Sequence, residues 1–280
     1  MTRQEGNTPP RRGAAAVPRP AATIVVLRDG AAGPEVLLQQ RHGGGDFAGA
    51  WVFPGGLVSE ADRDPALSAC SVGLTPERAE RVGASGRLAF AFWAAALREC
   101  FEESGVLIGG RRDATGAVVP LSAADHRRLA PWRRRLDSGE ATLLEFCRGN
   151  DLVMDFSAMC YFSFWTTPRF RPRRYATRFF ACRVAATVSG TADGREAVAH
   201  RWLAPAEALR LGEEGELVLH PPTVAQLTTL SGGATAAAIV ERLREREHLG
   251  VAEVLPRLEE RDGRRRLVIG ERSAGEGADV

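Results

Sequence analysis

The sequence of 280 residues contains no lysine, and all 37 of its basic residues are arginine. That absence excludes reactions that need a lysine amine, such as Schiff-base catalysis, phosphate binding by a P-loop lysine and the nucleotide contact of protein kinases. The 35 acidic residues leave a formal net charge of +2, which gives no overall attraction to nucleic acid or an anionic membrane. Any bound phosphate must therefore be held by arginine, backbone N–H groups or a metal ion.

Cysteines and long apolar runs are also scarce. The five cysteines are widely spaced and form no C-x-x-C pair, which excludes a typical disulfide framework or zinc site and predicts a reducing compartment. No stretch reaches the roughly 18 apolar residues of a transmembrane helix, so we predict no membrane contact and a cytoplasmic location. The polar, proline-rich residues 1–19 are predicted to form a disordered tail, and residues 271–280 a flexible one.

The hydropathy pattern predicts one mixed α/β domain over residues 20–270, because strand-like runs alternate with a few capped helical segments around a single core. A helix start is expected at Thr75, and residues 111–150 are expected to form a surface excursion that contains a basic helix. The expected strands are 23–27, 36–40, 51–53, 106–108, 158–165, 177–188, 197–203 and 267–269. The expected helices are 88–104, 123–136, 205–211, 222–230 and 235–247.

The helix expected over 88–104 carries the most informative pattern. Glu99, Glu102 and Glu103 stand at i, i+3 and i+4, so they share one face and repel one another unless a cation lies between them. Oxygen ligands of this kind suit Mg²⁺ or Mn²⁺. Arg98 lies four residues before Glu102 and is placed to pair with it. The competing interpretation is a solvated acidic surface, which is the commoner fate of glutamate pairs.

The string R-E-x-x-E-E-x-G at residues 98–105 resembles the core of the Nudix box, the signature of Nudix hydrolases. Gly56, in a P-G-G turn, and Asp62, where glutamate is usual, match the earlier part of that box. Thirty-five residues separate Asp62 from Arg98 where the family usually has seven, so we assign a long insertion to residues 63–97. The resemblance implies an α/β/α sandwich with a mixed sheet.

The resemblance also implies roles for the box residues. Nudix enzymes cleave a diphosphate linked to another moiety, and a metal ion neutralises the diphosphate and activates water. The implied metal ligands are the Gly56 carbonyl, Glu99, Glu102 and Glu103. Asp62 is expected to pair with Arg98 or, alternatively, to be an exposed loop residue. The general base stays open between Glu102 or Glu103 on the helix and a distant acid, Glu196, for which an exposed turn residue is the commoner interpretation.

The long insertion within the box resembles that of the Nudix subgroup that includes a peroxisomal coenzyme A diphosphatase. Further segments resemble that subgroup, among them LLQQRH at 37–42, WVFPGG at 51–56 and RWLAPAEAL at 201–209. The implied substrate is coenzyme A or acyl-coenzyme A, cut to phosphopantetheine and adenosine 3′,5′-bisphosphate. The alternatives are a nucleotide sugar or dinucleotide as substrate, or a catalytically silent ligand-sensing domain.

Arginines are the expected contacts of the substrate phosphates, since lysine is absent. We assign this role to Arg41, Arg174 and Arg178, against the alternative of a solvated arginine-rich surface. The arginine run 127–135 is interpreted as a solvated helix face, with a subunit contact in a homodimer as the alternative. The G-x-G-x-x-A string at 43–48 resembles a dinucleotide fingerprint, but WVFPGG follows it instead of a helix, so we reject that interpretation.

Overall fold

The computed structural model describes residues 16–42, 48–190, 197–261 and 264–272. Glu196, residues 43–47 and most of both predicted tails lie outside this part of the chain. The tail predictions are wrong at their inner edges, because Arg19 already begins a strand and Glu271–Arg272 form another.

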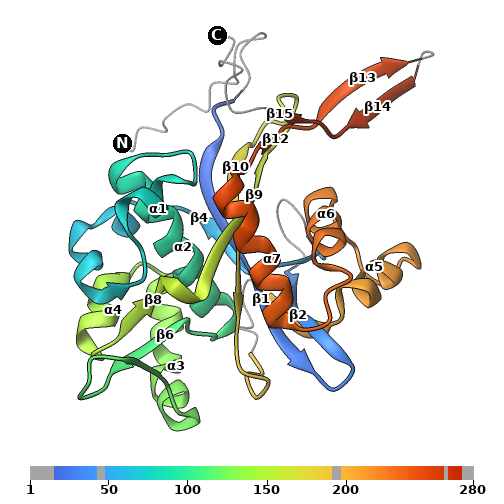
Figure 1. Ribbon diagram of the computed structural model, residues 1–280. Coiled ribbons are helices and arrows are strands. Elements are labelled where there is room, and N and C mark those ends of the chain that lie inside the picture. The colour runs from blue at the N-terminus through green and yellow to red at the C-terminus, as the bar shows by residue number, and fades with distance from the viewer. Residues whose placement is uncertain (1–15, 43–47, 191–196, 262–263, 273–280) are drawn as a thin grey trace, which may run out of the picture.

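A nine-stranded mixed sheet forms the centre of the molecule, in the order β11-β2-β1-β10-β9-β12-β15, with β3 paired to β2 and β4 to β1 (Figure 1). β1 runs parallel to β10, and β12 runs parallel to β9, whereas the other neighbours are antiparallel. The strands are β1 (Arg19–Gly30), β2 (Gly33–Arg41), β3 (Trp51–Val52), β4 (Gly55–Leu57), β9 (Met159–Thr166), β10 (Tyr175–Arg183), β11 (Ala197–Leu203), β12 (Glu253–Val254) and β15 (Glu271–Arg272).

Helices cover both faces of this sheet, which confirms the predicted α/β/α class (Figure 1). Successive side chains of a strand point to opposite faces, and β1 follows this rule. Ile24 and Val26 pack in one core with α2 (Gly86–Ser104), whereas Val25 and Leu27 pack in a second core with the C-terminal helices. Those helices are α5 (Pro205–Glu213), α6 (Pro221–Leu230) and α7 (Ala236–Leu249).

The helix α2 is the buried centre of the first core. Its alanine-rich middle is a good helix former that also allows close packing, and Trp93 and Phe101 are almost fully buried. The helix ends at Gly105, whose φ of 72° is the left-handed conformation that favours glycine and whose N–H donates to the Phe101 carbonyl at 2.9 Å. The predicted end of this helix is therefore confirmed.

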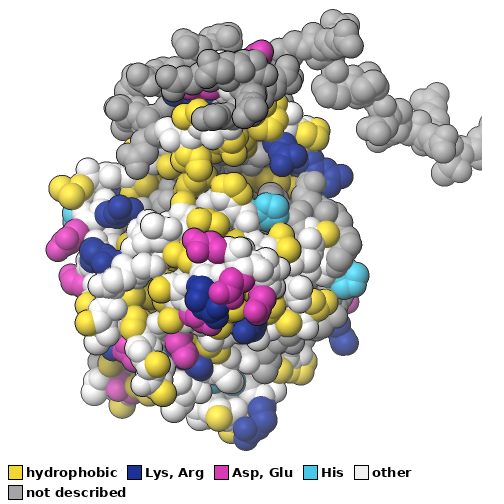
Figure 2. All heavy atoms as spheres, turned by 90° about the vertical axis from the view of Figure 1, so that its right-hand side faces the viewer, with side chains coloured by type: hydrophobic (Ala, Val, Ile, Leu, Met, Phe, Trp, Pro, Cys, Tyr) yellow, Lys and Arg dark blue, Asp and Glu magenta, His cyan; other side chains and the backbone are white. Residues whose placement is uncertain are grey.

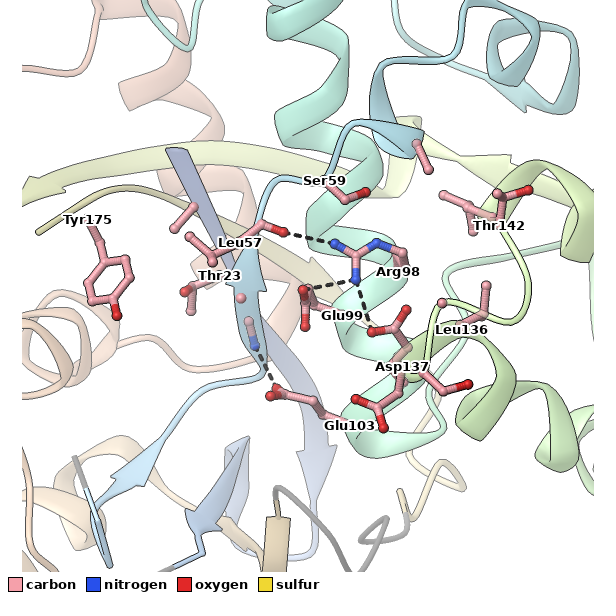
Figure 3. A pocket seen from close by; sticks show the side chains of 18 of the residues that line it. Thr23, Leu57, Ser59, Arg98, Glu99, Glu103, Leu136, Asp137, Thr142 and Tyr175 are labelled. Atoms are coloured by element: carbon pink, nitrogen blue, oxygen red, sulfur yellow. Dashed lines mark hydrogen bonds and ion pairs between the residues drawn. The ribbon is translucent and has the colours of Figure 1, made fainter. Parts of the chain in front are cut away.

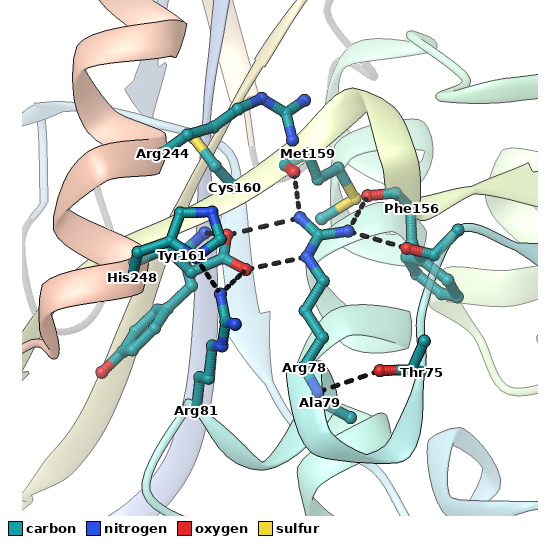
Figure 4. A network of polar contacts seen from close by, with 12 residues as sticks. Thr75, Arg78, Ala79, Arg81, Phe156, Met159, Cys160, Tyr161, Arg244 and His248 are labelled. Carbon is teal, nitrogen blue, oxygen red and sulfur yellow. Dashed lines mark hydrogen bonds and ion pairs between the residues drawn. The ribbon is translucent and has the colours of Figure 1, made fainter.

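The segment that precedes α2 forms short elements that pack beside it. They are η1 (Ala61–Arg63), η2 (Pro65–Cys70), β5 (Ser71–Val72) and α1 (Pro76–Glu80), which begins after the Thr75 cap as predicted. Arg78 in α1 forms a buried ion pair with Glu247 in α7, with 2.7 Å between Nε and Oε1, and donates to the Phe156 carbonyl at 2.9 Å (Figure 4). Glu247 also accepts a hydrogen bond from the Tyr161 N–H at 3.0 Å. This network joins the insertion to the C-terminal helix.

A second, four-stranded sheet in the order β5-β8-β6-β7 lies on the α2 side of the molecule, and the predicted excursion over 111–150 supplies β7 and part of β6 (Figure 1). Residues 109–158 form β6 (Gly109–Arg112), β7 (Val118–Pro120), α3 (Ala123–Asp137), α4 (Leu143–Gly149), β8 (Val153–Asp155) and η3 (Phe156–Ala158). The strand expected at 106–108 is wrong. β6 begins at Gly109 instead, because a Cβ there would lie 2.2 Å from the Val153 carbonyl oxygen and only glycine permits the pairing with β8.

The C-terminal region ends in a projecting hairpin of β13 (Arg257–Arg261) and β14 (Arg264–Val268) (Figure 1). The strand expected at 267–269 is the end of this hairpin. All five cysteines are free and buried, in agreement with the expected absence of disulfides. In the part of the chain that the structure describes, no helix has the length and apolar character needed to cross a membrane.

Candidate functional site

The last turns of α2 hold the three predicted carboxylates inside the protein. Glu99, Glu102 and Glu103 are only 8%, 6% and 3% exposed. In Figure 3, Glu99 and Glu103 point from α2 towards β4, and Tyr175 of β10 lies on the far side of that strand. The interpretation of a solvated acidic surface is therefore wrong. A buried group of three acids is costly unless protons, cations or hydrogen bonds compensate it.

Two glycines of β4 lie against the carboxylates of α2. The Gly55 N–H donates to Oε2 of Glu103 at 2.8 Å. A Cβ on Gly56 would lie 2.4 Å from Oε1 of Glu99, so a side chain at this position would occupy the space that the carboxylate fills. The Gly56 backbone thus lies against the acidic group, where the sequence prediction needs it.

Arg98 connects the acidic residues. Its guanidinium forms a two-point ion pair with Asp62, with Nε to Oδ1 at 2.8 Å and Nη2 to Oδ2 at 3.0 Å, and it donates to the Leu57 carbonyl at 2.9 Å. Nη1 lies 2.9 Å from both Glu99 and Glu102. Asp62 is fully buried, so the predicted pairing across the insertion is confirmed and the exposed-loop alternative is wrong.

The electrostatics of this group follow from its burial. Desolvation alone would lower the pKa of Arg98, but the carboxylates of Glu99, Asp62 and Glu102 outweigh it and hold that pKa well above its usual range. Burial raises the pKa of Glu102 to about 8. The charge of Arg98 lowers this pKa, but the neighbouring carboxylate of Glu99 raises it and partly cancels the effect of Arg98. Oε1 of Glu102 is buried and accepts no hydrogen bond within the described part of the chain. Binding a proton or a cation would therefore stabilise this carboxylate.

This donor set fits a hard divalent cation. Carboxylate and carbonyl oxygens are the ligands that Mg²⁺ and Mn²⁺ prefer. The three glutamates and the backbone of Gly56 line the same cavity. Among the described residues, no three acidic, histidine or cysteine side chains already converge on one point as a preformed metal site. Glu99 and Glu102 each have an oxygen paired with Arg98, while Glu103 accepts from Gly55.

A residue that sequence reasoning placed on the surface supports the acidic helix. Arg133 of α3 donates from Nε to the Glu102 carbonyl at 2.9 Å and from Nη2 to the Glu103 carbonyl at 2.8 Å. These carbonyls belong to the last turn of α2, where a cation is favourable because the final carbonyls have no partner within the helix. The interpretation of run 127–135 as a solvated face is therefore wrong for Arg133. Its neighbours in the run give no signal that singles it out.

A cavity of about 760 Å³ opens in front of the carboxylates, between β1, β4 and β10 on one side and the loop from α3 to α4 on the other (Figure 3). Arg41 lines it, as predicted for a substrate contact, and Arg173 lines it too. Sequence reasoning missed Asp137 and Tyr175, which also line it. Neither residue type nor spacing marks these two, because they lie at an element end and a strand start that only folding brings together.

Arg174 and Arg178 do not lie among the cavity lining residues. Arg174 is buried and donates to the carbonyls of Ala16 and Thr167 at 2.7 and 2.9 Å. Arg178 is also buried; it donates to the Val82 carbonyl at 3.0 Å and lies over the rings of Phe92 and Phe164. Both guanidinium groups are thus used within the fold. The remaining predicted residue, Glu196, lies outside the described residues.

Comparison with known proteins agrees with the geometry. A sequence model of the NUDT19 Nudix domain matches residues 75–230, more than half of the chain. The chain is 32% identical to the acyl-coenzyme A diphosphatase NUDT19 of Gallus gallus over 229 residues, which are 70% of this chain and 60% of that protein. It is 30% identical to the Homo sapiens protein of the same name over 262 residues, 84% of this chain and 66% of that protein.

The fold is similar to that of a solved Nudix hydrolase from Alicyclobacillus acidocaldarius, with a TM-score of 0.60 and 29% identity over 81% of this chain and 97% of that one. The matched regions span 60% and 66% of the two curated relatives, so each relative is longer than the part shared with this chain. The family match includes α2 with its buried carboxylates and Arg98. The chain therefore belongs to the family of NUDT19 Nudix domains.

Proposed function

We propose that this protein hydrolyses the diphosphate linkage of coenzyme A or acyl-coenzyme A in the presence of a divalent metal ion. Water adds across the P–O–P bridge, which leaves one phosphate on (acyl-)phosphopantetheine and the other on adenosine 3′,5′-bisphosphate. The observation that carries this proposal is the buried set Glu99, Glu102 and Glu103 at the floor of a 760 Å³ cavity. The names of the curated relatives support the choice of substrate.

In the proposed reaction, Glu99, Glu102, Glu103 and the Gly56 carbonyl would hold Mg²⁺ or Mn²⁺. The bound ion supplies charge neutralisation of the diphosphate and lowers the pKa of the attacking water. Arg98 orients Glu99 and Glu102, and the Gly55 N–H orients Glu103. These contacts fix the carboxylates before substrate arrives, which reduces the reorganisation that the reaction requires.

The chain's other residues contribute to substrate orientation and proton transfer. Arg41 and Arg173 line the cavity and would contact the diphosphate. A carboxylate must take the proton from water, and the candidates are Glu102 or Glu103 on α2 and Asp137 across the cavity. Glu196 stays a further candidate from the sequence. The homodimer and the cytoplasmic location also stay predictions.

The test is a substrate panel with Mg²⁺ or Mn²⁺: coenzyme A, octanoyl-coenzyme A, a nucleotide sugar and a dinucleotide, with products separated by chromatography. We expect coenzyme A compounds to be cleaved at the diphosphate and Glu103→Gln to lower kcat at least 100-fold. Glu140→Gln, an exposed change in the nearby α3–α4 loop, is the matched control and should retain full activity. Absence of turnover with all four compounds would favour a ligand-sensing domain, and faster turnover of the other compounds would favour the alternative substrates.

A further inference from the structure

A second cavity of about 410 Å³ adjoins the first on the α6 side of the sheet. It is enclosed by β9, β10 and the loop between them, by the start of α6, and by Pro256 and Leu267 of the C-terminal region. The two cavities share six lining residues: Thr23, Arg41, Gly55, Arg173, Tyr175 and Thr177. They are therefore two compartments of one site that meet beside Gly55 of β4, and we call them the acidic and the apolar compartment.

The apolar compartment differs from its neighbour in chemistry. None of its lining residues is acidic, whereas the acidic compartment has four carboxylates. Its walls are mostly hydrocarbon and aromatic side chains: Val52, Phe53, Trp165, Phe170, Phe179 and Leu267. Figure 2 views the side of the molecule on which α5, α6 and the hairpin lie, and it shows hydrophobic side chains gathered in the upper part of this face.

An irregularity in the sheet gives the compartment its largest aromatic wall. The register between β10 and β9 shifts between Phe179 and Phe180, so the alternation of β9 side chains is reversed beyond Phe162. Ser163 therefore points towards α6, where it accepts a hydrogen bond from Gln226 at 3.0 Å, and Trp165 joins the same core. Because of this bulge, the indole of Trp165, and not the ring of Phe164, lies on the α6 side of the sheet.

The start of α6 offers this compartment no anion site, and of the three arginines in its lining, Arg41, Arg171 and Arg173, two also line the acidic compartment. Helix N-termini usually bind anions through free N–H groups, but α6 begins with Pro221 and Pro222, which have none. Burial, with Arg171 nearby, lowers the pKa of His220, so its ring is neutral at pH 7. The hydroxyl of Thr166 is buried and has no hydrogen-bond partner within the described part of the chain. A ligand here should therefore be largely apolar, with a polar group that can pair with this hydroxyl.

We propose that the apolar compartment binds the acyl-pantetheine arm of an acyl-coenzyme A, while the acidic compartment holds the diphosphate and the nucleotide. This proposal rests on the proposed function. An acyl-pantetheine arm combines a hydrocarbon chain with amide groups, and it is attached directly to the diphosphate, which would lie where the two compartments meet. Arg41 and Arg173 line both compartments, and the phosphorylated nucleotide is assigned to the acidic one, whose far wall carries polar side chains such as Ser138 and Thr142.

The first measurement is kcat/KM for coenzyme A and for its acetyl, butanoyl, hexanoyl and octanoyl esters with the wild-type protein. Each added methylene that leaves water for an apolar wall should raise kcat/KM two- to fourfold, until the compartment is full. A flat series across the chain lengths would overturn the proposal. Turnover of unacylated coenzyme A in the same assay keeps the proposed function separate from this result.

Variants locate the effect. Phe170→Asp and Leu267→Asp change lining side chains that are 51% and 44% exposed, so the fold should tolerate them. Each should lower the octanoyl-to-coenzyme A ratio of kcat/KM at least fivefold. Ile269→Asp, a similarly exposed change two residues beyond Leu267 and outside the lining, is the matched control and should keep the wild-type ratio.

Two results would contradict the assignment. An equal loss for coenzyme A and the octanoyl ester in Phe170→Asp would contradict the placement of the acyl chain beside Phe170, because the affected part would be one that both substrates share, either the pantetheine arm or the nucleotide. An unchanged ratio in both variants would place the acyl chain elsewhere. If no coenzyme A compound is cleaved by the wild-type protein, the proposed function itself fails.

Discussion

Replacing Gly56 by alanine should lower activity about 100-fold without unfolding the protein. A Cβ at this position would lie 2.4 Å from Oε1 of Glu99, whereas ordinary contacts begin near 3.4 Å, so the carboxylate must move by about 1 Å. The atoms that must move are the far end of a flexible side chain, which keeps the cost in stability small. A misplacement of this size at a catalytic centre typically lowers the rate about 100-fold. We expect that loss in kcat/KM for coenzyme A, with a melting temperature near that of the wild type.

Gly55→Ala provides the informative contrast. Its Cβ would lie 2.6 Å from the Ala22 carbonyl oxygen and 2.7 Å from the Thr23 Cα, and this backbone belongs to the paired strand β1. Because β1 cannot yield locally, Gly55→Ala should lower the melting temperature as well as the activity. Thermal unfolding and steady-state kinetics on both variants check the pair. Gly56→Ala with kcat/KM within threefold of the wild type would refute the placement of Glu99 at the catalytic centre.

Three further predictions concern the supports of the site. Glu247→Gln should lower the free energy of unfolding by about 3 kcal/mol in denaturant titration, because Arg78 loses its buried ionic partner. The control Glu241→Gln, an exposed change on the same helix, should alter the free energy of unfolding by less than about 0.5 kcal/mol. Arg133→Met should lower kcat about tenfold with a smaller effect on KM, because the last turn of α2 loses its cap; an unchanged kcat would assign Arg133 to stability alone. The rise in melting temperature caused by Mg²⁺ should be larger at pH 8.5 than at pH 6.5. Because the pKa of Glu102 is raised, the metal-free fold is most stable when this carboxyl is protonated, and it loses that stability as pH rises towards 8. At the higher pH the cation takes the place of the proton and restores the stability. A Mg²⁺-induced increase in melting temperature that is the same at both pH values would contradict this prediction.

The α2 helix and its acids were predictable because their pattern is local. Three carboxylates at helical spacing, an arginine four residues before one of them and a terminating glycine are all read within eight residues. β11 was predicted with its observed bounds, since Ala197–Leu203 alternates clearly. The strand expected at 106–108 failed because β6 depends on the contact of Gly109 with Val153, more than forty residues away.

The roles of three arginines could not be read from the sequence. Arg133, Arg174 and Arg178 all hydrogen-bond to backbone carbonyls, and every residue carries a carbonyl, so no partner residue type marks such a contact in advance. A long guanidinium side chain reaches solvent, ligand or backbone with equal ease, and the fold selects among them. In this fold, Arg174 and Arg178 donate to backbone carbonyls, whereas Arg41 lines the cavity.

By itself, the sequence determined the α/β class, the Nudix family and the identity of the buried acids, because each is encoded in short-range spacing and residue chemistry. Only the tertiary structure decided that Asp62 meets Arg98 across the insertion, that Asp137 and Tyr175 line the cavity, and that an apolar compartment adjoins it. These features join segments distant in the chain. Their geometry depends on how the two cores pack against the sheet, which no local pattern specifies.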